Sequence, residues 1–206
     1  MPEFDAILFD FDGVLADTEP VHWACWSEVL RTLGVDLEWD FYRDQCIGID
    51  DREMLRMMAQ TAEPPRTWES LWELYPAKKE LFRGRMTARP PFTEETGGML
   101  QQLGAAYQLA VVSSSSTEEI EPMLQAGGLR HFFATVVGGN QVKQQKPSPE
   151  PYLLAAERLG VRTALVVEDS AAGIAAGRAA GFEVLAVKHP SEVGRLLKER
   201  LSRAAV

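Results

Sequence analysis

The sequence predicts an α/β protein, with a parallel sheet covered by helices on both faces and a helical segment inserted after the first strand. Short apolar runs alternate with helical stretches over most of the 206 residues, as expected for right-handed crossovers between parallel strands. The apolar runs are nearly continuous, which is typical of strands buried on both faces. All five tryptophans fall in one segment that has no strand-like run.

The expected strands are apolar runs that stop at polar or turn-forming residues. The first spans residues 4–11 and stops at Asp10-Phe11-Asp12-Gly13, and the others span residues 107–113, 133–138, 164–169 and 182–187. In such a doubly wound, Rossmann-like sheet, ligands bind outside the carboxyl ends of the strands. We therefore expect the polar residues that end three of these strands to meet at one edge: Asp10, Ser113, Glu168 and Asp169.

The expected helices of the sheet domain span residues 93–103, 117–126, 149–159, 171–180 and 192–201. This domain comprises residues 1–14 and 87–206, and residues 15–86 form the inserted helical domain. Within the insertion, apolar residues recur at helical spacing over residues 21–33, 53–59 and 68–86. The tryptophans are expected to form this domain's own core.

Composition excludes several classes of protein. The net charge of −9 and the pI near 4.9 have the wrong sign for binding nucleic acid or an anionic membrane surface. No apolar run reaches the roughly 18 residues of a membrane helix, and the acidic start is unlike a signal peptide. Two cysteines are too few for a disulfide framework. We expect a cytoplasmic monomer that binds neither nucleic acid nor membrane.

Asp10 and Asp12 stand two residues apart, so an extended chain would aim both carboxylates to the same side. Two carboxylates this close repel each other unless a cation lies between them or one has a raised pKa. Mg²⁺ suits such a site, with Asp169 as a third carboxylate from another strand. The alternative is an ordinary Asp-Gly turn with solvated carboxylates.

The whole stretch Asp10-Phe11-Asp12-Gly13-Val14-Leu15-Ala16-Asp17-Thr18 resembles the nucleophile motif of the haloacid dehalogenase-like superfamily of phosphohydrolases. The family's other motifs follow in order: a strand that ends in Ser113, then Lys146-Pro147-Ser148-Pro149, then Glu168-Asp169-Ser170. Four ordered motifs are far more specific than one. The resemblance covers nearly the whole chain, including the helical cap, and is strongest to the subgroup of β-phosphoglucomutase, phosphoglycolate phosphatase and small sugar-phosphate phosphatases.

The resemblance implies a Mg²⁺-dependent reaction through an aspartyl-phosphate. Asp10 would be the nucleophile, and Asp12 would protonate the leaving oxygen and then activate water. Ser113 and Lys146 would hold the phosphoryl oxygens. The implied metal ligands are Asp10, Asp12 through its backbone carbonyl, Asp169 and Glu168, the last either directly or as an outer partner. Taken singly, each has an ordinary structural explanation. Ser113 could simply end a strand, Lys146 could be a solvated loop lysine, and Glu168-Asp169-Ser170 could be the start of a helix.

Further substrate contacts are expected beside the first two motifs and in the cap: Gly13, Thr18, Glu19, His22, Gly48, Arg52, Lys78, Ser114 and Ser115. His22 fits a packing residue equally well. Asp51 stands where the resemblance to mutases places an arginine, and Thr117 stands where it places an asparagine. Both departures weaken the expected binding of a second phosphate group.

We therefore predict a phosphatase of a small phosphorylated metabolite, such as a sugar phosphate. A β-phosphoglucomutase-like hexose-phosphate mutase is the alternative. The resemblance disfavours a dehalogenase, because family members with that activity lack the second aspartate and Asp12 is present here. It also disfavours a non-enzymatic binding protein, because the nucleophile, acid/base and metal positions are all intact.

Overall fold

The computed structural model describes residues 3–47, 49, 51–63 and 65–202 and divides the chain into two compact units. The core unit comprises Met1–Asp17 and Arg89–Val206, and the inserted unit comprises Thr18–Ala88. Both divisions fall slightly later than the expected boundaries after residues 14 and 86. Ala16 stays with the core unit because it pairs with Phe92 and accepts a hydrogen bond from the Gly13 backbone N–H at 2.8 Å.

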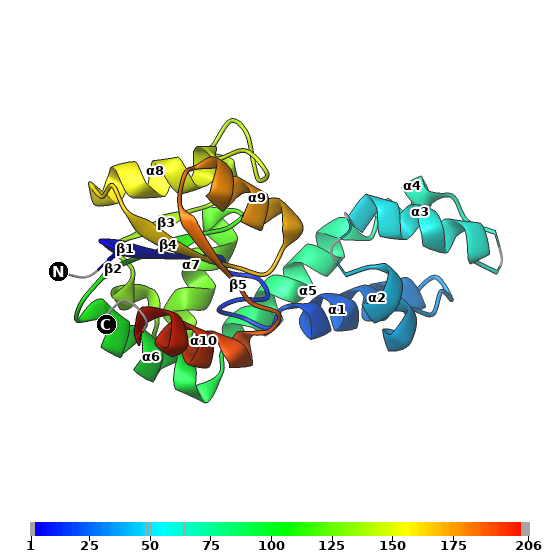
Figure 1. The fold of residues 1–206 in the computed structure, drawn as a ribbon. Coiled ribbons are helices and arrows are strands. Elements are labelled where there is room, and N and C mark those ends of the chain that lie inside the picture. The colour runs from blue at the N-terminus through cyan, green and yellow to red at the C-terminus, as the bar shows by residue number, and fades with distance from the viewer. Residues whose placement is uncertain (1–2, 48, 50, 64, 203–206) are drawn as a thin grey trace. The chain divides into compact units, whose positions relative to one another are not determined.

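In the described residues, five parallel strands form the sheet of the core unit, in the order β3-β2-β1-β4-β5 (Figure 1). Their bounds are β1 Ala6–Phe9, β2 Gln108–Val112, β3 Thr135–Val137, β4 Ala164–Glu168 and β5 Glu183–Ala186. The chain starts in the central strand and winds out to both edges, so the predicted doubly wound, Rossmann-like sheet is confirmed. Phe9 pairs with both Val111 and Val167, which places the carboxyl ends of β1, β2 and β4 at the same level.

Helices cover both faces of this sheet (Figure 1). The helices α8 and α9 lie on one face and α6, α7 and α10 on the other; their bounds are α6 Glu94–Gly104, α7 Thr117–Ala126, α8 Glu150–Leu159, α9 Ala171–Ala179 and α10 Pro190–Ser202. Leu8 and Val166 pack with Tyr152 of α8 and Ala176 of α9 in one buried cluster. The alternate residues of β1 are fully buried as well, which explains why its sequence is continuously apolar.

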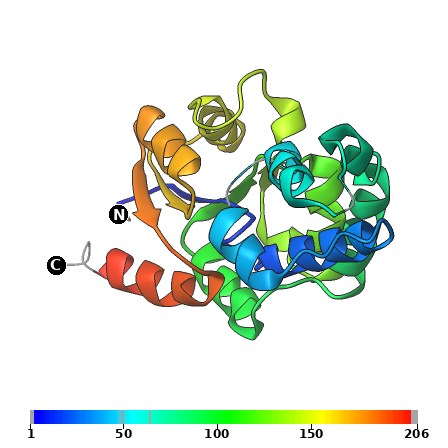
Figure 2. The ribbon, with the colours of Figure 1, turned by 90° about the vertical axis from the view of Figure 1, so that its right-hand side faces the viewer.

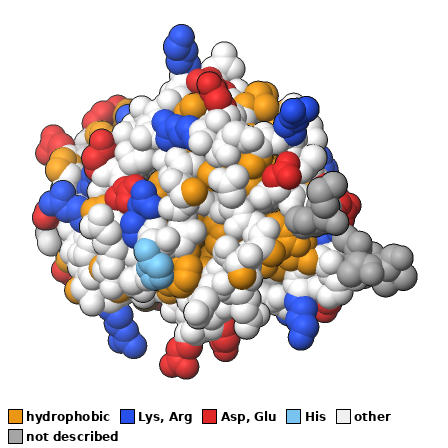
Figure 3. Space-filling model, turned by 90° about the vertical axis from the view of Figure 1, so that its left-hand side faces the viewer, with side chains coloured by type: hydrophobic (Ala, Val, Ile, Leu, Met, Phe, Trp, Pro, Cys, Tyr) orange, Lys and Arg blue, Asp and Glu red, His pale blue; other side chains and the backbone are white. Residues whose placement is uncertain are grey.

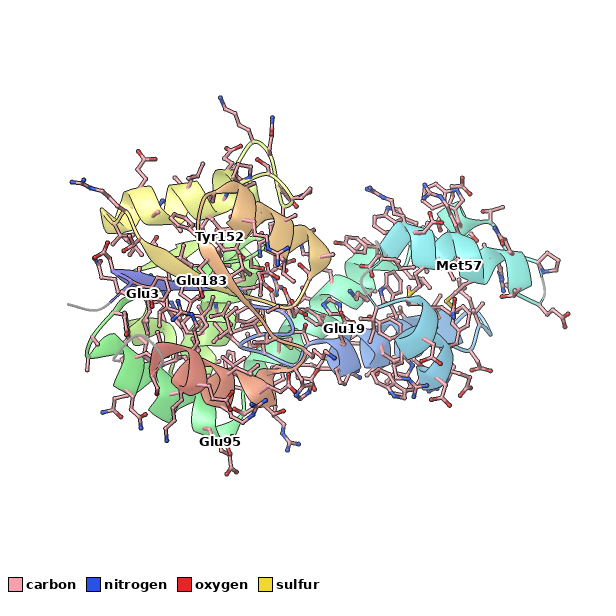
Figure 4. All side chains as sticks on the ribbon, in the orientation of Figure 1. Glu3, Glu19, Met57, Glu95, Tyr152 and Glu183 are labelled. Carbon is pink, nitrogen blue, oxygen red and sulfur yellow. The ribbon has the colours of Figure 1, made fainter. Side chains whose placement is uncertain are left out.

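The strand β5 departs from the expected burial on both faces. Its end residues Glu183 and Ala186 are exposed because β5 forms an edge of the sheet. Arg200 of α10 donates hydrogen bonds to Glu183 at 2.7 Å and to Glu3 at 2.9 Å, two residues that Figure 4 labels. This ion-pair network joins the last helix, the edge strand and the first described residue, and Figure 2 shows α10 on the same side as the N-terminus.

The inserted unit is helical, as expected. Its elements are α1 Glu19–Arg31, α2 Trp39–Gln45, α3 Asp51–Thr61, α4 Trp68–Trp72 and α5 Tyr75–Ala88. Trp26 is fully buried at its centre, and Trp23, Trp39 and Trp72 pack against the same cluster, so most of the tryptophans do form this unit's own core.

Two features of the inserted unit were not expected. The sequence pattern did not predict α2, and the single helix expected over residues 68–86 is divided into α4 and α5. Pro76 explains the division because it has no backbone N–H to continue a helix but is favoured in the first turn of a new one.

The surface carries apolar side chains interspersed with charged ones, as Figure 3 shows for one face. A groove of the core unit lies between α6 and α10, where Met99 and Leu197 line it together with Glu95 and Lys198. None of the described helices combines the length and the apolarity needed to cross a bilayer.

Candidate active site

Three neighbouring strands of the core unit end in polar side chains. Asp10 follows β1, Ser113 follows β2, and Glu168 is the last residue of β4, with Asp169 next to it. Asp10 donates its backbone N–H to the Val167 carbonyl at 3.0 Å, which continues the sheet beyond the end of β1. The fold therefore holds these side chains at one edge on regular backbone.

Lys146 reaches this edge from the loop before α8, with only 4% of its side chain exposed. Its ammonium donates to Asp10 Oδ1 at 2.5 Å, to Glu168 Oε1 at 2.6 Å and to the Val112 carbonyl at 3.0 Å. Burial opposes the charged form, but the negative charges of Asp10 and Glu168 outweigh it and raise the pKa of Lys146. The structure thus fixes a positive charge beside Asp10.

Glu168 is fully buried, and both of its carboxylate oxygens accept hydrogen bonds. Oε1 faces Lys146 and the Tyr152 hydroxyl, which donates at 2.9 Å. Oε2 accepts from the backbone N–H groups of Asp169 and Ser170 at 2.9 and 3.0 Å and from the Ser170 hydroxyl at 3.0 Å. Burial opposes ionisation, but Lys146 and these donors together hold the pKa of Glu168 below its ordinary value. This arrangement favours the outer-partner role for Glu168.

The carboxyl groups at this edge outnumber the positive charge of Lys146. Burial raises the pKa of Asp10 well above its ordinary value, and the charges of Glu168 and Asp12 add to the effect although Lys146 opposes it. Desolvation and the charge of Glu168 raise the pKa of Asp169 to about 6, although its side chain reaches solvent. Single carboxylate oxygens of Asp10, Glu168 and Asp169 lie within 4.8 Å of one another. Asp10 and Asp169 fit ligands of a divalent metal, with Glu168 beside them, and the metal would relieve the repulsion among the three carboxylates.

Asp12 directs its carboxylate toward the serines that follow β2. Its Oδ2 accepts hydrogen bonds from the Ser115 hydroxyl at 3.2 Å and the Ser113 hydroxyl at 3.5 Å. The Ser113 hydroxyl in turn accepts from the Ser115 backbone N–H at 3.0 Å, while Ser114 between them is exposed. The structure therefore brings Asp12, Ser113 and Ser115 together. A metal contact from the Asp12 backbone carbonyl stays a prediction.

Two glycines leave room for the acidic side chains. Gly13 has φ +75°, and a Cβ there would lie 2.1 Å from Asp169 Oδ2. A Cβ on Gly173 of α9 would lie 1.6 Å from Glu168 Oε1. Both positions thus require glycine: Gly13 for the turn and the close approach, and Gly173 for the approach alone.

Replacing Gly173 by alanine is expected to lower the free energy of unfolding by about 1–3 kcal/mol, because the new methyl group overlaps the buried carboxylate of Glu168. Urea denaturation measures this effect. Gly98→Ala is the matched control, since Gly98 lies in α6 with open space around its Cβ position, and there alanine should stabilise by up to about 1 kcal/mol. An unchanged urea midpoint for Gly173→Ala would show that the Glu168 site tolerates the added methyl group.

The inserted unit holds a second polar cluster. The Lys78 ammonium, buried in α5, lies 2.8 Å from His22 Nδ1 and 3.4 Å from Asp51 Oδ2. Trp26 Nε1 donates to Asp51 Oδ1 at 2.8 Å, and the His22 ring stacks on Phe82 with centroids 4.0 Å apart. Burial and the charge of Lys78 lower the pKa of His22 to about 3. His22 is therefore neutral and accepts the hydrogen bond from Lys78 at Nδ1.

Other predicted residues of this unit make different contacts. The guanidinium of Arg52 lies over the Trp72 ring at 4.7 Å from its centroid. Glu19 accepts a hydrogen bond from the Tyr42 hydroxyl at 2.8 Å. Thr18 is buried directly before α1. Substrate contact by these residues, and by His22 and Lys78, stays a prediction.

The sequence pattern did not indicate a role for Tyr152, and Asp51 was expected only as a departure from the mutases. The available signal for Tyr152 was an aromatic hydroxyl six positions after Lys146, in the first turn of the expected helix. The partnership of Asp51 with Lys78 joins two different helices, so no spacing in the sequence indicates it. Gly48, also predicted as a substrate contact, lies outside the described residues.

Comparison with known proteins gives consistent matches. The family model described as haloacid dehalogenase-like hydrolase matches residues 7–187. A phosphorylated carbohydrates phosphatase of Thermotoga maritima is 32% identical over 199 residues, covering 95% of this chain and 90% of the relative. Fructose-1-phosphate phosphatase YqaB of Escherichia coli is 31% identical over 190 residues, covering 90% of this chain and 97% of the relative.

A solved structure supports the same grouping. The crystal structure of CbbY from Rhodobacter sphaeroides in complex with phosphate has a TM-score of 0.69 and 29% sequence identity. The match covers 88% of this chain and 84% of CbbY.

Proposed function

Because the chain belongs to the haloacid dehalogenase-like hydrolases, we propose that it is a phosphoric monoester hydrolase that acts on a small phosphorylated carbohydrate through an aspartyl-phosphate. The observation that carries the proposal is the contact of Asp10 with Lys146 at 2.5 Å, beside the acidic Asp169. A nucleophile, a fixed positive charge and a candidate cation site then share one edge of the sheet. Relatives named as phosphatases of phosphorylated carbohydrates support the substrate class.

In the first step, a carboxylate oxygen of Asp10 forms a bond to phosphorus while the bond from phosphorus to the ester oxygen breaks. Asp12 gives its proton to that oxygen, and the alcohol leaves. The positive charge of Lys146 and the hydroxyl of Ser113 stabilise the charge on the phosphoryl oxygens. Ser115 orients Asp12 through its 3.2 Å hydrogen bond.

In the second step, a water oxygen forms a bond to phosphorus while the bond from phosphorus to Asp10 breaks. Asp12 accepts a proton from that water, which restores both aspartates and releases phosphate. Glu168 keeps Lys146 in place during both steps because its carboxylate also accepts hydrogen bonds from four donors other than Lys146.

We propose Mg²⁺ as the cation because it prefers carboxylate and carbonyl oxygens. Asp10, Asp169 and the Asp12 backbone carbonyl are the groups that would hold it. When bound, the ion screens the repulsion between the Asp10 carboxylate and the phosphate oxygens.

A panel of phosphate esters tests this proposal. We expect phosphate release from one or more hexose or pentose phosphates in the presence of Mg²⁺, loss of release with EDTA, and recovery when Mg²⁺ is added back. Phosphoglycolate and nucleoside monophosphates belong in the same panel to define the substrate class.

Two results would contradict the proposal. Conversion of a hexose 1-phosphate to the 6-phosphate without phosphate release would show a mutase. Absence of both reactions across the panel would remove the assigned hydrolase activity.

A further inference from the structure

Tyr152 is a buried aromatic residue next to the reacting groups, and the mechanism above does not use it. It lies in the first turn of α8, where Figure 4 labels it, and is fully buried between that helix and the sheet. Because no part of its side chain reaches solvent, Tyr152 cannot contact a substrate. Any effect that it has on the reaction must therefore act through its neighbours.

Two contacts join Tyr152 to the groups beside Asp10. Its hydroxyl donates to Glu168 Oε1 at 2.9 Å, the oxygen that also accepts from Lys146 at 2.6 Å. Its ring face lies 5.1 Å from the Lys146 ammonium, a distance that suits a cation–π interaction. Tyr152 thus contacts both members of the Lys146–Glu168 ion pair and is itself fully buried.

The hydroxyl is one of the groups that restrict rotation of the Glu168 carboxylate. The donors of Ser170 and Asp169 hold Oε2, whereas among the described residues the two donors on Oε1 are Lys146 and Tyr152. Of these two, only Tyr152 is on a rigid short side chain anchored in a helix; lysine has a long, flexible stem. Without the hydroxyl, the position of Oε1 would be set by the donors on the other oxygen and by Lys146, the flexible partner that Oε1 itself contacts.

We propose that Tyr152 is a positioning residue, which holds the Lys146 ammonium against Asp10 by fixing the carboxylate of Glu168. The inference rests on the proposed phosphatase function for its kinetic consequence. Its geometric consequence, the placement of Lys146, holds whatever the reaction is.

The variant Tyr152→Phe tests this because it removes one oxygen and keeps the ring. Lys146 is assigned to the phosphoryl group in the transition state, so its displacement should lower kcat by about ten- to a hundredfold, with KM changed less than kcat. A hydroxyl that only stabilised the fold would lower the unfolding midpoint and leave kcat per folded molecule unchanged. Tyr107→Phe removes a hydroxyl from a partly buried residue before β2 and serves as the matched control, with wild-type kcat expected.

Crystal structures of the wild type and Tyr152→Phe give a readout that does not depend on activity. We expect a rotated Glu168 carboxylate and a Lys146 ammonium beyond hydrogen-bond distance of Asp10. Wild-type kcat in Tyr152→Phe, or an unmoved Lys146 in its crystal structure, would overturn the inference. If the wild type hydrolyses no phosphate ester, the proposed function fails, and the crystal structures alone decide the role of Tyr152.

Discussion

Asp10→Asn is expected to lower kcat for phosphate release by roughly 10⁴-fold or more, the scale on which loss of a nucleophile acts. An amide has no carboxylate oxygen to bond to phosphorus, so the covalent route is closed. Folding should be retained, because asparagine has nearly the same shape and Lys146 keeps its ion pair with Glu168. Phosphate release and urea denaturation of the same preparation measure the two effects separately.

Asp36→Asn is the control for Asp10→Asn, because it makes the same chemical change on an exposed side chain 3.8 Å from Arg31. Purified in parallel, it should keep wild-type activity, whereas any phosphate release left in Asp10→Asn gives the upper limit on contaminating phosphatase. If Asp10→Asn retains more than roughly a hundredth of the wild-type kcat while Asp36→Asn has the wild-type value, Asp10 is not the nucleophile.

Lys146→Met is expected to give the largest loss of stability, a fall of about 3–5 kcal/mol in the free energy of unfolding. The substitution leaves Glu168, which is fully buried, and Asp10, which is nearly so, without the ammonium that both contact. Urea denaturation measures the fall. Lys143→Met, at an exposed position of the same loop, should change the free energy of unfolding by less than about 0.5 kcal/mol.

A double variant separates the loss of charge balance from the loss of packing. Lys146→Met combined with Glu168→Gln removes both charges of the pair, so it should regain part of the stability lost in Lys146→Met alone. A double variant that is less stable than Lys146→Met would assign the loss to packing and contradict the electrostatic account.

The strands of the core unit were predictable from sequence because a continuously apolar run indicates a strand that is buried on both faces. Residues 164–168 are all buried and all but the last apolar, which only a central parallel strand requires. The same reasoning predicted the strand β5 but not its exposure, because an apolar run does not show whether a strand lies at the edge of the sheet. Helical spacing of the apolar residues also failed to indicate the break between α4 and α5 at residues 73–74. The spacing continues through this break, and Pro76 lies in the first turn of the new helix.

The side chains of the candidate active site could be predicted from the strand ends, but their hydrogen-bond partners could not. Asp10 and Asp169 each follow a strand, so topology alone brings them to one edge. The choice of Glu168 as the partner of Lys146, with Tyr152 behind it, depends on how α8 packs on the sheet. In the inserted unit the Lys78–Asp51 contact joins two helices, and no local pattern specifies it.

Covalent attachment of phosphate to Asp10 tests the central claim most directly. Acid quenching during turnover of a radiolabelled phosphate ester, chosen from the panel, should leave label on the protein that hydroxylamine releases. No lysine or arginine precedes Arg31, so trypsin places Asp10 in the peptide of residues 1–31, and fragmentation by mass spectrometry locates the phosphate within it. We predict label on Asp10 in the wild type and none in Asp10→Asn. Label on another residue, or an unlabelled wild type during steady turnover, would contradict the account.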